Sequence, residues 1–284
     1  FFIAPTLICL LVVLAYPLAL IVGMSFFDVE PTRHVGWVFT GMGNYREIVR
    51  DRDMWGSLAN TAIWTIGSVA IQFVVGLAGA LVLREHFRGN ALLRSLLLVP
   101  WATPAVVGAL AWKWMYHGQY GLVNAFLRTL GFREVSVAWL GDPRTAMGAV
   151  IVTNAWRGFP FIMLMLLAGL LSVPDTLREA AAIDGASFWQ DLRYVTLPQL
   201  RPVVLVSTLL AGIWTFNNFS YIYILTGGGP AGRTDILVTF VYRNAFKYFR
   251  FGYAAALSVV LFLLVLLASA AYIRLVGRES LGLD

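Results

Sequence analysis

The chain has 284 residues, of which 59% are hydrophobic and 13% charged, and its mean hydropathy is +0.75. A soluble domain has about 45–50% apolar and about 25% charged residues, so this composition excludes an ordinary soluble protein and indicates an integral membrane protein. The formal net charge is +6, but Lys and Arg are spread along short segments, which argues against nucleic-acid binding. The single cysteine, Cys9, excludes an intrachain disulfide and a Cys-based metal site.

A helix needs roughly 20 apolar residues to cross a hydrocarbon core of about 30 Å. The runs that satisfy this requirement are about 1–27, 58–83, 91–115, 145–171, 203–225 and 253–273. We therefore expect an all-α integral membrane fold, a six-helix transmembrane bundle forming one domain over 1–284, with both termini on the same side. The first run is too long for the apolar core of a signal peptide, and because the sequence starts without Met we expect a further segment before it.

The interiors of these runs are poor in charge. None contains Asp or Glu, and the cations within them are Arg94 and Lys113, each near one end of the third run, and Arg157, deeper inside the fourth. Carriers driven by protons or sodium usually keep ionisable or ion-coordinating groups inside the membrane. The sequence therefore indicates that the energy for any transport comes from outside this chain. A sodium site made of carbonyl and hydroxyl oxygens would leave an ion-coupled secondary transporter as the alternative.

Two runs carry polar side chains beside aromatic rings, in NAWRGFPF (154–161) and WTFNNFSY (214–221). A buried amide without partners costs on the order of a few kcal/mol, so these groups must be paired. They could hydrogen-bond between helices, or they could line a polar cavity in which rings stack on a sugar while amides bind its hydroxyls. Gly158 and Pro160 predict a break in the fourth run, which favours the cavity. The candidate wall residues are Trp156, Phe159, Phe161, Trp214, Phe216, Phe219 and Tyr221.

The polar segment between the fourth and fifth runs reads SVPDTLREAAAIDGASFWQDLRYVTLPQLRP (172–202). Gly185 is placed to stop a first short helix in a left-handed conformation. Ser187 and Gln190 form a capping-box pattern that starts a second helix, which Pro198 would end. The sequence predicts two short helices with a sharp bend between them, outside the bilayer. On these grounds alone the pair could be a solvated connector.

The segment also resembles a long and specific motif, E-A-A-x-x-x-G-x9-[I/V]-x-L-P, of permease subunits in binding-protein-dependent ABC importers. The matching residues are Glu179, Ala180, Ala181, Gly185, Val195, Leu197 and Pro198. Its IDGASFWQ and LPQLRP stretches look like the carbohydrate-importer branch. VPWATPAVVGALAWKWMY (99–116) and LTGGGPAGRTDILVTFVYRNAF (225–246) look like the larger permease of maltose-type systems, so the resemblance covers most of the chain.

The resemblance implies a type I ABC importer permease that takes up a sugar or an anionic sugar derivative across the bacterial cytoplasmic membrane, with cytoplasmic termini. It implies a heterodimer with a second permease, two copies of an ATPase subunit and an extracytoplasmic binding protein, all in membrane lipid and without nucleic acid. It implies no catalysis, cofactor or metal in this chain, because ATP and Mg belong to the ATPase. The coupling segment 172–202 would contact that ATPase through Glu179, Ala180, Ala181, Asp184, Gly185, Leu197 and Pro198. Lys and Arg are not concentrated on the side so assigned, and we let the motif decide the orientation.

The same resemblance implies a substrate site near the middle of the membrane. The matching positions are Asn154, Arg157, Gly158, Phe161, Ala211, Trp214, Thr215 and Asn218. Arg157 departs from the maltose pattern, where the position is apolar, and Ala211 and Thr215 replace Ser and Asn. A guanidinium in a dry cavity needs a partner, so we expect either an acid in a partner chain or an anionic substrate. Alternatively, Arg157 reaches toward the interface or binds helix carbonyls.

Two further features of the sequence, a glycine-rich segment and the histidines, do not predict a functional site. Residues 224–235, ILTGGGPAGRTD, have the spacing of a phosphate loop, but Arg233 stands at the lysine position and the segment follows an apolar run directly. We expect a turn exposed on the extracytoplasmic side. His34, His86 and His117 are isolated along the chain, so no ligand cluster or catalytic dyad is predicted from their spacing.

Overall fold

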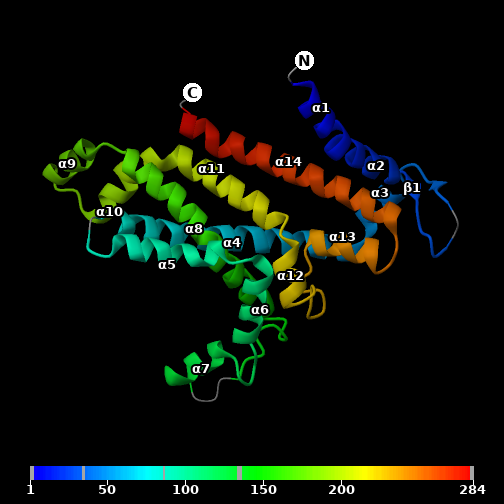
Figure 1. The fold of residues 1–284 in the computed structure, drawn as a ribbon, viewed down its shortest axis with the longest axis horizontal. Helices are drawn as coiled ribbons and strands as arrows, with labels where there is room; N and C mark the ends of the chain where they lie inside the picture. Colours follow the sequence, from blue (N-terminus) through cyan, green and yellow to red (C-terminus); the bar gives the residue numbers. More distant parts are fainter. Residues whose placement is uncertain (1–2, 34–35, 86, 133–135, 282–284) are drawn as a thin grey trace. The chain divides into compact units, whose positions relative to one another are not determined.

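The computed structural model describes residues 3–33, 36–85, 87–132 and 136–281. These residues form two compact units, the first made of residues up to 61 together with 235–267, and the second of 62–234 together with the residues from 268 onward. Figure 1 shows the order of the helices along the chain. Two long helices, α4 (Arg52–Arg84) and α14 (Phe251–Leu281), pass from one unit to the other, so each unit is described by itself.

The first unit joins the two ends of the sequence. Besides the first part of α4 and most of α14 it holds α1 (Ala4–Leu10), the π-helix η1 (Leu11–Ala15), α2 (Tyr16–Met24), β1 (Phe27–Asp28), β2 (Val38–Phe39), α3 (Gly43–Arg50) and α13 (Leu237–Phe246). The strands pair antiparallel, with Phe27 opposite Phe39. Buried Asn44 donates its amide to the carbonyls of Ser25 and Phe27, both at 2.9 Å, and so attaches α3 to the end of α2. A Cβ on Gly252 would collide with the Phe27 carbonyl, so only glycine lets α14 start against this chain.

The second unit contains the remaining elements. They are α5 (Asn90–Ala102), α6 (Ala105–Met115), α7 (Leu122–Thr129), α8 (Ala146–Ser172), α9 (Asp175–Ile183), α10 (Phe188–Gln190), the π-helix η2 (Asp191–Thr196), α11 (Leu197–Phe216) and α12 (Phe219–Leu225). Its core is built on α8, whose Ile162, Met163 and Leu166 are fully buried between α4 and α11. Gly79 lets α4 approach closely, because a Cβ there would lie 2.8 Å from the Met163 sulfur. The second unit thus packs around helix α8.

Four described helical stretches are long and apolar enough to cross a membrane: Arg52–Arg84, Ala146–Ser172, Phe188–Phe216 and Phe251–Val276. Helices α5 and α6 pass the test together, but they meet at a bend of 95°. The bend falls at Thr103 and Pro104, because a residue before proline is driven out of the helical conformation. In the first predicted run the described apolar helix Leu11–Met24 is shorter, and its crossing stays a prediction.

Two predicted breaks are wrong, and a different one is present. Helix α8 continues unbroken through Gly158 and Pro160, because tight packing on its neighbours supports the helix where the proline removes a backbone bond. Pro198 does not end the second short helix, because α10, η2 and α11 form one stretch, in which the π-helix η2 ends at Thr196, just before the proline. The break lies instead at Asn217, between α11 and α12. The predicted stop at Gly185 (φ +78°) and the Ser187–Gln190 capping box are confirmed.

Candidate functional site

A cavity of about 120 Å³ opens within the second unit, between α4, α5, α8 and α11. Its lining residues are Gln72, Trp101, Asn154, Arg157, Gly158, Phe161, Ala211, Trp214, Thr215 and Asn218. All eight residues that the sequence predicts for the substrate site are among them. They converge because Asn154, Arg157, Gly158 and Phe161 repeat at helical spacing on one face of α8, and Ala211, Trp214 and Thr215 do so on one face of α11. Asn218 follows at the break between α11 and α12.

A chain of side-chain hydrogen bonds runs across the cavity wall. Asn218 donates its amide to the Asn154 side-chain oxygen at 3.3 Å, and Asn154 donates to the Thr215 hydroxyl at 3.3 Å. Asn218 also accepts the backbone N–H of Tyr221 and so caps α12. The amides therefore connect helices and line a polar cavity at once, and sugar binding in that cavity stays a prediction. These bonds are long for their kind, so the polar groups retain capacity for a ligand.

Arg157 brings a positive charge to this wall. Its guanidinium carbon lies 6.0 Å from the centre of the Tyr221 ring, a cation–π distance. Its Nε is buried and has no hydrogen-bond partner among the described residues, and the same is true of the Tyr221 hydroxyl. No carboxylate lines the cavity. A buried guanidinium nitrogen without an acceptor is costly, so the site as it stands in the described residues is electrostatically incomplete.

Fewer aromatic rings face the cavity than the sequence suggests. Phe161 and Trp214 do, with ring centres 4.7 Å apart at 60°, and Trp101 joins them from α5. Phe159 belongs instead to the hydrophobic core. Tyr221 is fully buried beneath Arg157. The aromatic part of the wall therefore consists of the rings on one side of α5, α8 and α11.

Gln72 and Trp101 also line the cavity, although the sequence did not predict them as site residues. Gln72 is 2% exposed on α4 and donates its amide to the Asn154 backbone carbonyl at 3.4 Å. A Cβ on Gly158 would lie 2.5 Å from the Gln72 carboxamide, so glycine at 158 is what admits this side chain. An available signal was the isolated Gln in the apolar stretch VAIQFVV of the second run. Only the fold shows that it points at the fourth run.

The segment between α8 and α11 forms a bent, exposed pair of helices. Glu179, Ala180, Asp184 and Gly185 are exposed on and just after α9. Leu197 and Pro198 lie apart from them, half-buried at the start of α11. Arg178 holds α9 to η2 through an ion pair with Asp191 at 3.5 Å.

Large apolar side chains are exposed on the same helix pair. Ile183 is 86% exposed and Trp189 is 73% exposed. Exposed apolar groups gathered on one bent element indicate a surface that another protein covers. Docking of this helix pair to another protein stays a prediction.

The glycine-rich segment is not a phosphate loop. It follows helix α12, not a strand, and the next helix, α13, begins only at Leu237. Thr226 and Thr234 close the segment on itself through a hydroxyl pair at 2.7 Å. The backbone at Gly227, Gly228 and Gly232 has positive φ, which explains the glycines as turn residues.

No group of three or more His, Cys, Asp or Glu side chains that could hold a metal occurs in the part of the chain that the structure describes. The His117 ring stacks on Tyr120 with centres 3.5 Å apart. His34 and His86 lie outside the described residues.

The second unit thus combines apolar helices with a small polar cavity and with an exposed helix pair, α9 and α10, here called the docking segment after its predicted role. The chain belongs to the family described as binding-protein-dependent transport system inner membrane component, whose model matches residues 72–279. The family match spans the cavity and the docking segment.

Relatives and solved structures agree with this family. The chain is 38% identical to the trehalose/maltose transport system permease protein MalF of Thermococcus litoralis, over 97% of this chain and 92% of that protein. It is 34% identical to the sulfoquinovosyl glycerol transport system permease protein SmoG of Agrobacterium fabrum, over 98% and 89%. Its fold is similar to a chain of a bacterial alginate ABC transporter in complex with an alginate pentasaccharide-bound periplasmic protein, with a TM-score of 0.82 at 21% identity, covering 98% and 93%.

Proposed function

We propose that this chain is one permease subunit of an ATP-driven ABC importer, and that it conducts a sugar or sugar derivative delivered by an extracytoplasmic binding protein. The gathering of all eight predicted residues around one polar, aromatic-walled cavity carries this proposal. Amides that bind hydroxyls next to rings that stack on sugar faces suit a carbohydrate. The relatives include permeases named for trehalose/maltose and sulfoquinovosyl glycerol transport, which supports the same substrate class.

The size of the cavity supports a shared site. Ligand cavities usually enclose about 300–1,000 Å³, and this one holds about 120 Å³. A whole disaccharide exceeds that space, so one sugar unit would be held here and the rest by a second permease. We propose a heterodimer in which both permeases contribute to the substrate site.

The exposed helix pair is the proposed coupling element. Its apolar side chains Ile183 and Trp189 would enter a cleft on an ATPase subunit, of which the assembled importer would hold two copies. Closure of the ATPase dimer on ATP would then rock the permeases between inward- and outward-facing states. We place this element and both termini on the cytoplasmic side of a bacterial cytoplasmic membrane. ATP and Mg would be bound by the ATPase and not by this chain.

Arg157 leaves two assignments open for the substrate. The buried Nε–H could donate a hydrogen bond to an acidic residue of the second permease, or to an anionic group on the sugar. The sulfoquinovosyl glycerol relative supports the second assignment. The alternative in which Arg157 binds helix carbonyls would require a carbonyl oxygen that accepts from Nε, and no such acceptor is present among the described residues.

Supplying one energy source at a time distinguishes an ATP-driven importer from an ion-coupled carrier. The chain, its partner permease and the ATPase are reconstituted in proteoliposomes with the binding protein and a labelled sugar. We expect uptake with ATP and none with a sodium or proton gradient alone. Uptake by this chain without the ATPase would contradict the proposal and establish a secondary transporter.

A further inference from the structure

A second cavity, of about 530 Å³, lies at the turn between α4 and α5. Its lining residues are Leu83, Arg84, Glu85, Phe87, Arg88, Asn90, Arg94 and Leu171. Leu171 is the penultimate residue of α8, directly before the segment that leads to α9. The cavity therefore lies at the same end of the second unit as the docking segment, at the level where apolar helices give way to polar chain.

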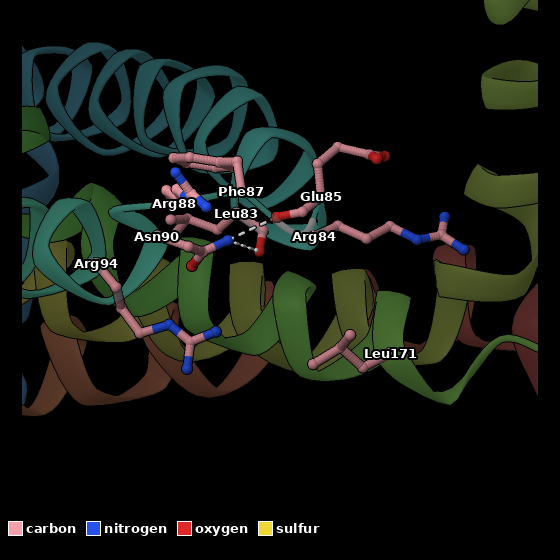
Figure 2. Close-up of a pocket in the computed structure, with 8 residues that line it drawn as sticks. All are labelled: Leu83, Arg84, Glu85, Phe87, Arg88, Asn90, Arg94 and Leu171. Carbon is pink, nitrogen blue, oxygen red and sulfur yellow. Dashed lines mark hydrogen bonds between the residues drawn. The ribbon is translucent and has the colours of Figure 1, made fainter.

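The turn that carries this cavity is held in shape by one side chain. Asn90 donates its amide to the carbonyls of Leu83 at 2.9 Å and Glu85 at 2.7 Å, and so satisfies the end of α4. Figure 2 shows these two bonds at the centre of the turn, with Arg88 and Arg94 on one side and Arg84 extending from the other. Asn90 thus ties the start of α5 to the end of α4, the two helix ends that carry Arg94 and Arg84.

The charge of the lining is strongly positive. The described lining holds three arginines and one carboxylate, that of Glu85, whose side chain points away from Arg94 in Figure 2. Within the described ranges neither Arg88 nor Arg94 forms an ion pair with an acid. Guanidinium groups match phosphate oxygens in geometry as well as in charge.

Apolar side chains stand beside these charges. Phe87 is 43% exposed and Leu171 is 60% exposed, although both line the cavity. A soluble anion would gain nothing from such a wall, whereas an acyl chain would cover it. Basic cavities between transmembrane helices on the cytoplasmic side are a known way to hold anionic lipid head groups.

We propose that this cavity binds the phosphate of an anionic membrane lipid, with Arg88 and Arg94 on the phosphate oxygens and with Phe87 and Leu171 along the first part of an acyl chain. The lipid would seal the cleft where α4, α5 and α8 leave the bilayer, next to the docking segment. The site is separate from the polar cavity around Asn154 and does not depend on which substrate is carried.

The test is lipid binding by the purified full-length chain, titrated with phosphatidylglycerol and, separately, with phosphatidylcholine. A basic residue near a membrane surface contributes about fivefold in affinity, so Arg88→Gln combined with Arg94→Gln is expected to weaken phosphatidylglycerol binding about 25-fold. The matched control is Arg193→Gln with Arg201→Gln, which removes the same charge from a different cavity at the start of α11. We expect that control to change binding less than about threefold.

Two further measurements separate the sources of phosphate. Glycerophosphoglycerol, the head group without acyl chains, is expected to bind at least about tenfold more weakly than the lipid, and Phe87→Ser is expected to reduce that difference. Equal binding of the head group would overturn the lipid assignment, as would equal losses in the two double variants. A photoreactive amino acid at position 87 that captures the ATPase and no lipid would identify the surface as a protein contact and would also overturn it.

Discussion

Gly158 and Gln72 stand so close that a Cβ on residue 158 would lie 2.5 Å from the Gln72 carboxamide. Because Gly158 is on α8 and Gln72 on α4, this contact brings a third helix to the cavity that α8 and α11 enclose. The Gln72 amide then bonds to the Asn154 carbonyl. The polar wall therefore depends on the absence of a side chain at position 158.

The first prediction concerns that contact. Gly158→Ala should swing the Gln72 carboxamide away from Asn154, at a stability cost of about 1–3 kcal/mol, and should lower the apparent affinity for substrate. Sugar uptake by the reconstituted importer measures the effect. Gly148→Ala on the same helix is the control, because a Cβ there meets nothing within 4 Å. Equal uptake by the two variants would show that Gln72 is not needed at the site.

The second prediction uses two neighbouring amides. Asn218 lines the cavity, whereas Asn217 bonds to the Ile213 carbonyl of its own helix and is exposed. Asn218→Ser keeps a good helix cap but cannot reach Asn154, so we expect substrate binding to weaken by about 1–3 kcal/mol. Asn217→Ser should leave binding within about twofold. Binding is measured as the concentration dependence of uptake, and similar losses in both variants would place the effect in the helix break instead of the cavity.

A third prediction addresses the charge of Arg157. If the guanidinium reads an anionic group, Arg157→Leu should lower uptake of anionic sugars at least about tenfold and change that of neutral sugars little. Arg157→Lys should retain part of the preference, because it keeps the charge without the forked geometry. Competition between a neutral and an anionic sugar measures the preference. An unchanged preference in Arg157→Leu would exclude the charge-reading role and favour an acid in the partner permease.

A fourth prediction concerns docking. Burial of Ile183 and Trp189 in a partner would contribute about 1.5–3 kcal/mol for each side chain, so Ile183→Asp with Trp189→Ser should abolish co-purification of the ATPase. Trp114→Ser is the control, since Trp114 is also exposed but lies on α6, away from the docking segment. Retention of the ATPase by the double variant would exclude the helix pair as the docking element.

A fifth prediction follows from Asp235 in the first unit. Burial raises the pKa of this carboxyl above its ordinary value of 3.8, although the Thr239 hydroxyl and Arg243 both lower it. In the pH range between the two values the folded chain keeps a proton that the unfolded chain has lost. The unfolded chain then binds fewer protons, so stability falls as pH rises through this range and is level on either side.

Variants at this ion pair test the sign. Arg243, which lies 2.8 Å from Asp235, lowers the carboxyl pKa, so Arg243→Met should extend the fall in stability to higher pH. Asp235→Asn should remove the carboxyl's contribution to the slope. The apparent Tm of the purified chain, followed by tryptophan fluorescence in acid and at neutral pH, measures both. A wild-type Tm that rises with pH while that of Asp235→Asn stays level would contradict the prediction.

Much of the cavity was predictable from the resemblance to maltose-type permeases, which implied all eight positions. The structure shows why these positions meet: Asn154, Gly158 and Phe161 share one face of α8, Ala211 and Thr215 share one face of α11, and Asn218 follows at the break after that helix. The exposed segment was also predictable, since Gly185 and the Ser187–Gln190 box are local signals that need no tertiary contact.

The positions of the helix breaks were not predictable in this way. Pro160 and Pro198 both suggest a break. Helix α8 nevertheless continues through Pro160, because neighbouring helices pack against it, and the chain stays helical from η2 into α11 through Pro198. The break occurs instead at Asn217 and Asn218, where side-chain bonds to Asn154 and to the Tyr221 backbone replace helical ones. Proline removes one backbone bond, and neighbouring helices decide whether the loss breaks the chain.

The amino-acid sequence by itself determined that the chain is a membrane bundle with apolar helices, two polar helix faces and an exposed bent segment, because composition and helical period are local properties. Only the tertiary structure decided which faces meet. It placed Gln72 and Trp101 beside the predicted residues and left the Arg157 Nε without an acceptor in the described chain. A helix face is encoded by residues a turn apart, whereas its partner depends on packing between segments far apart in the chain.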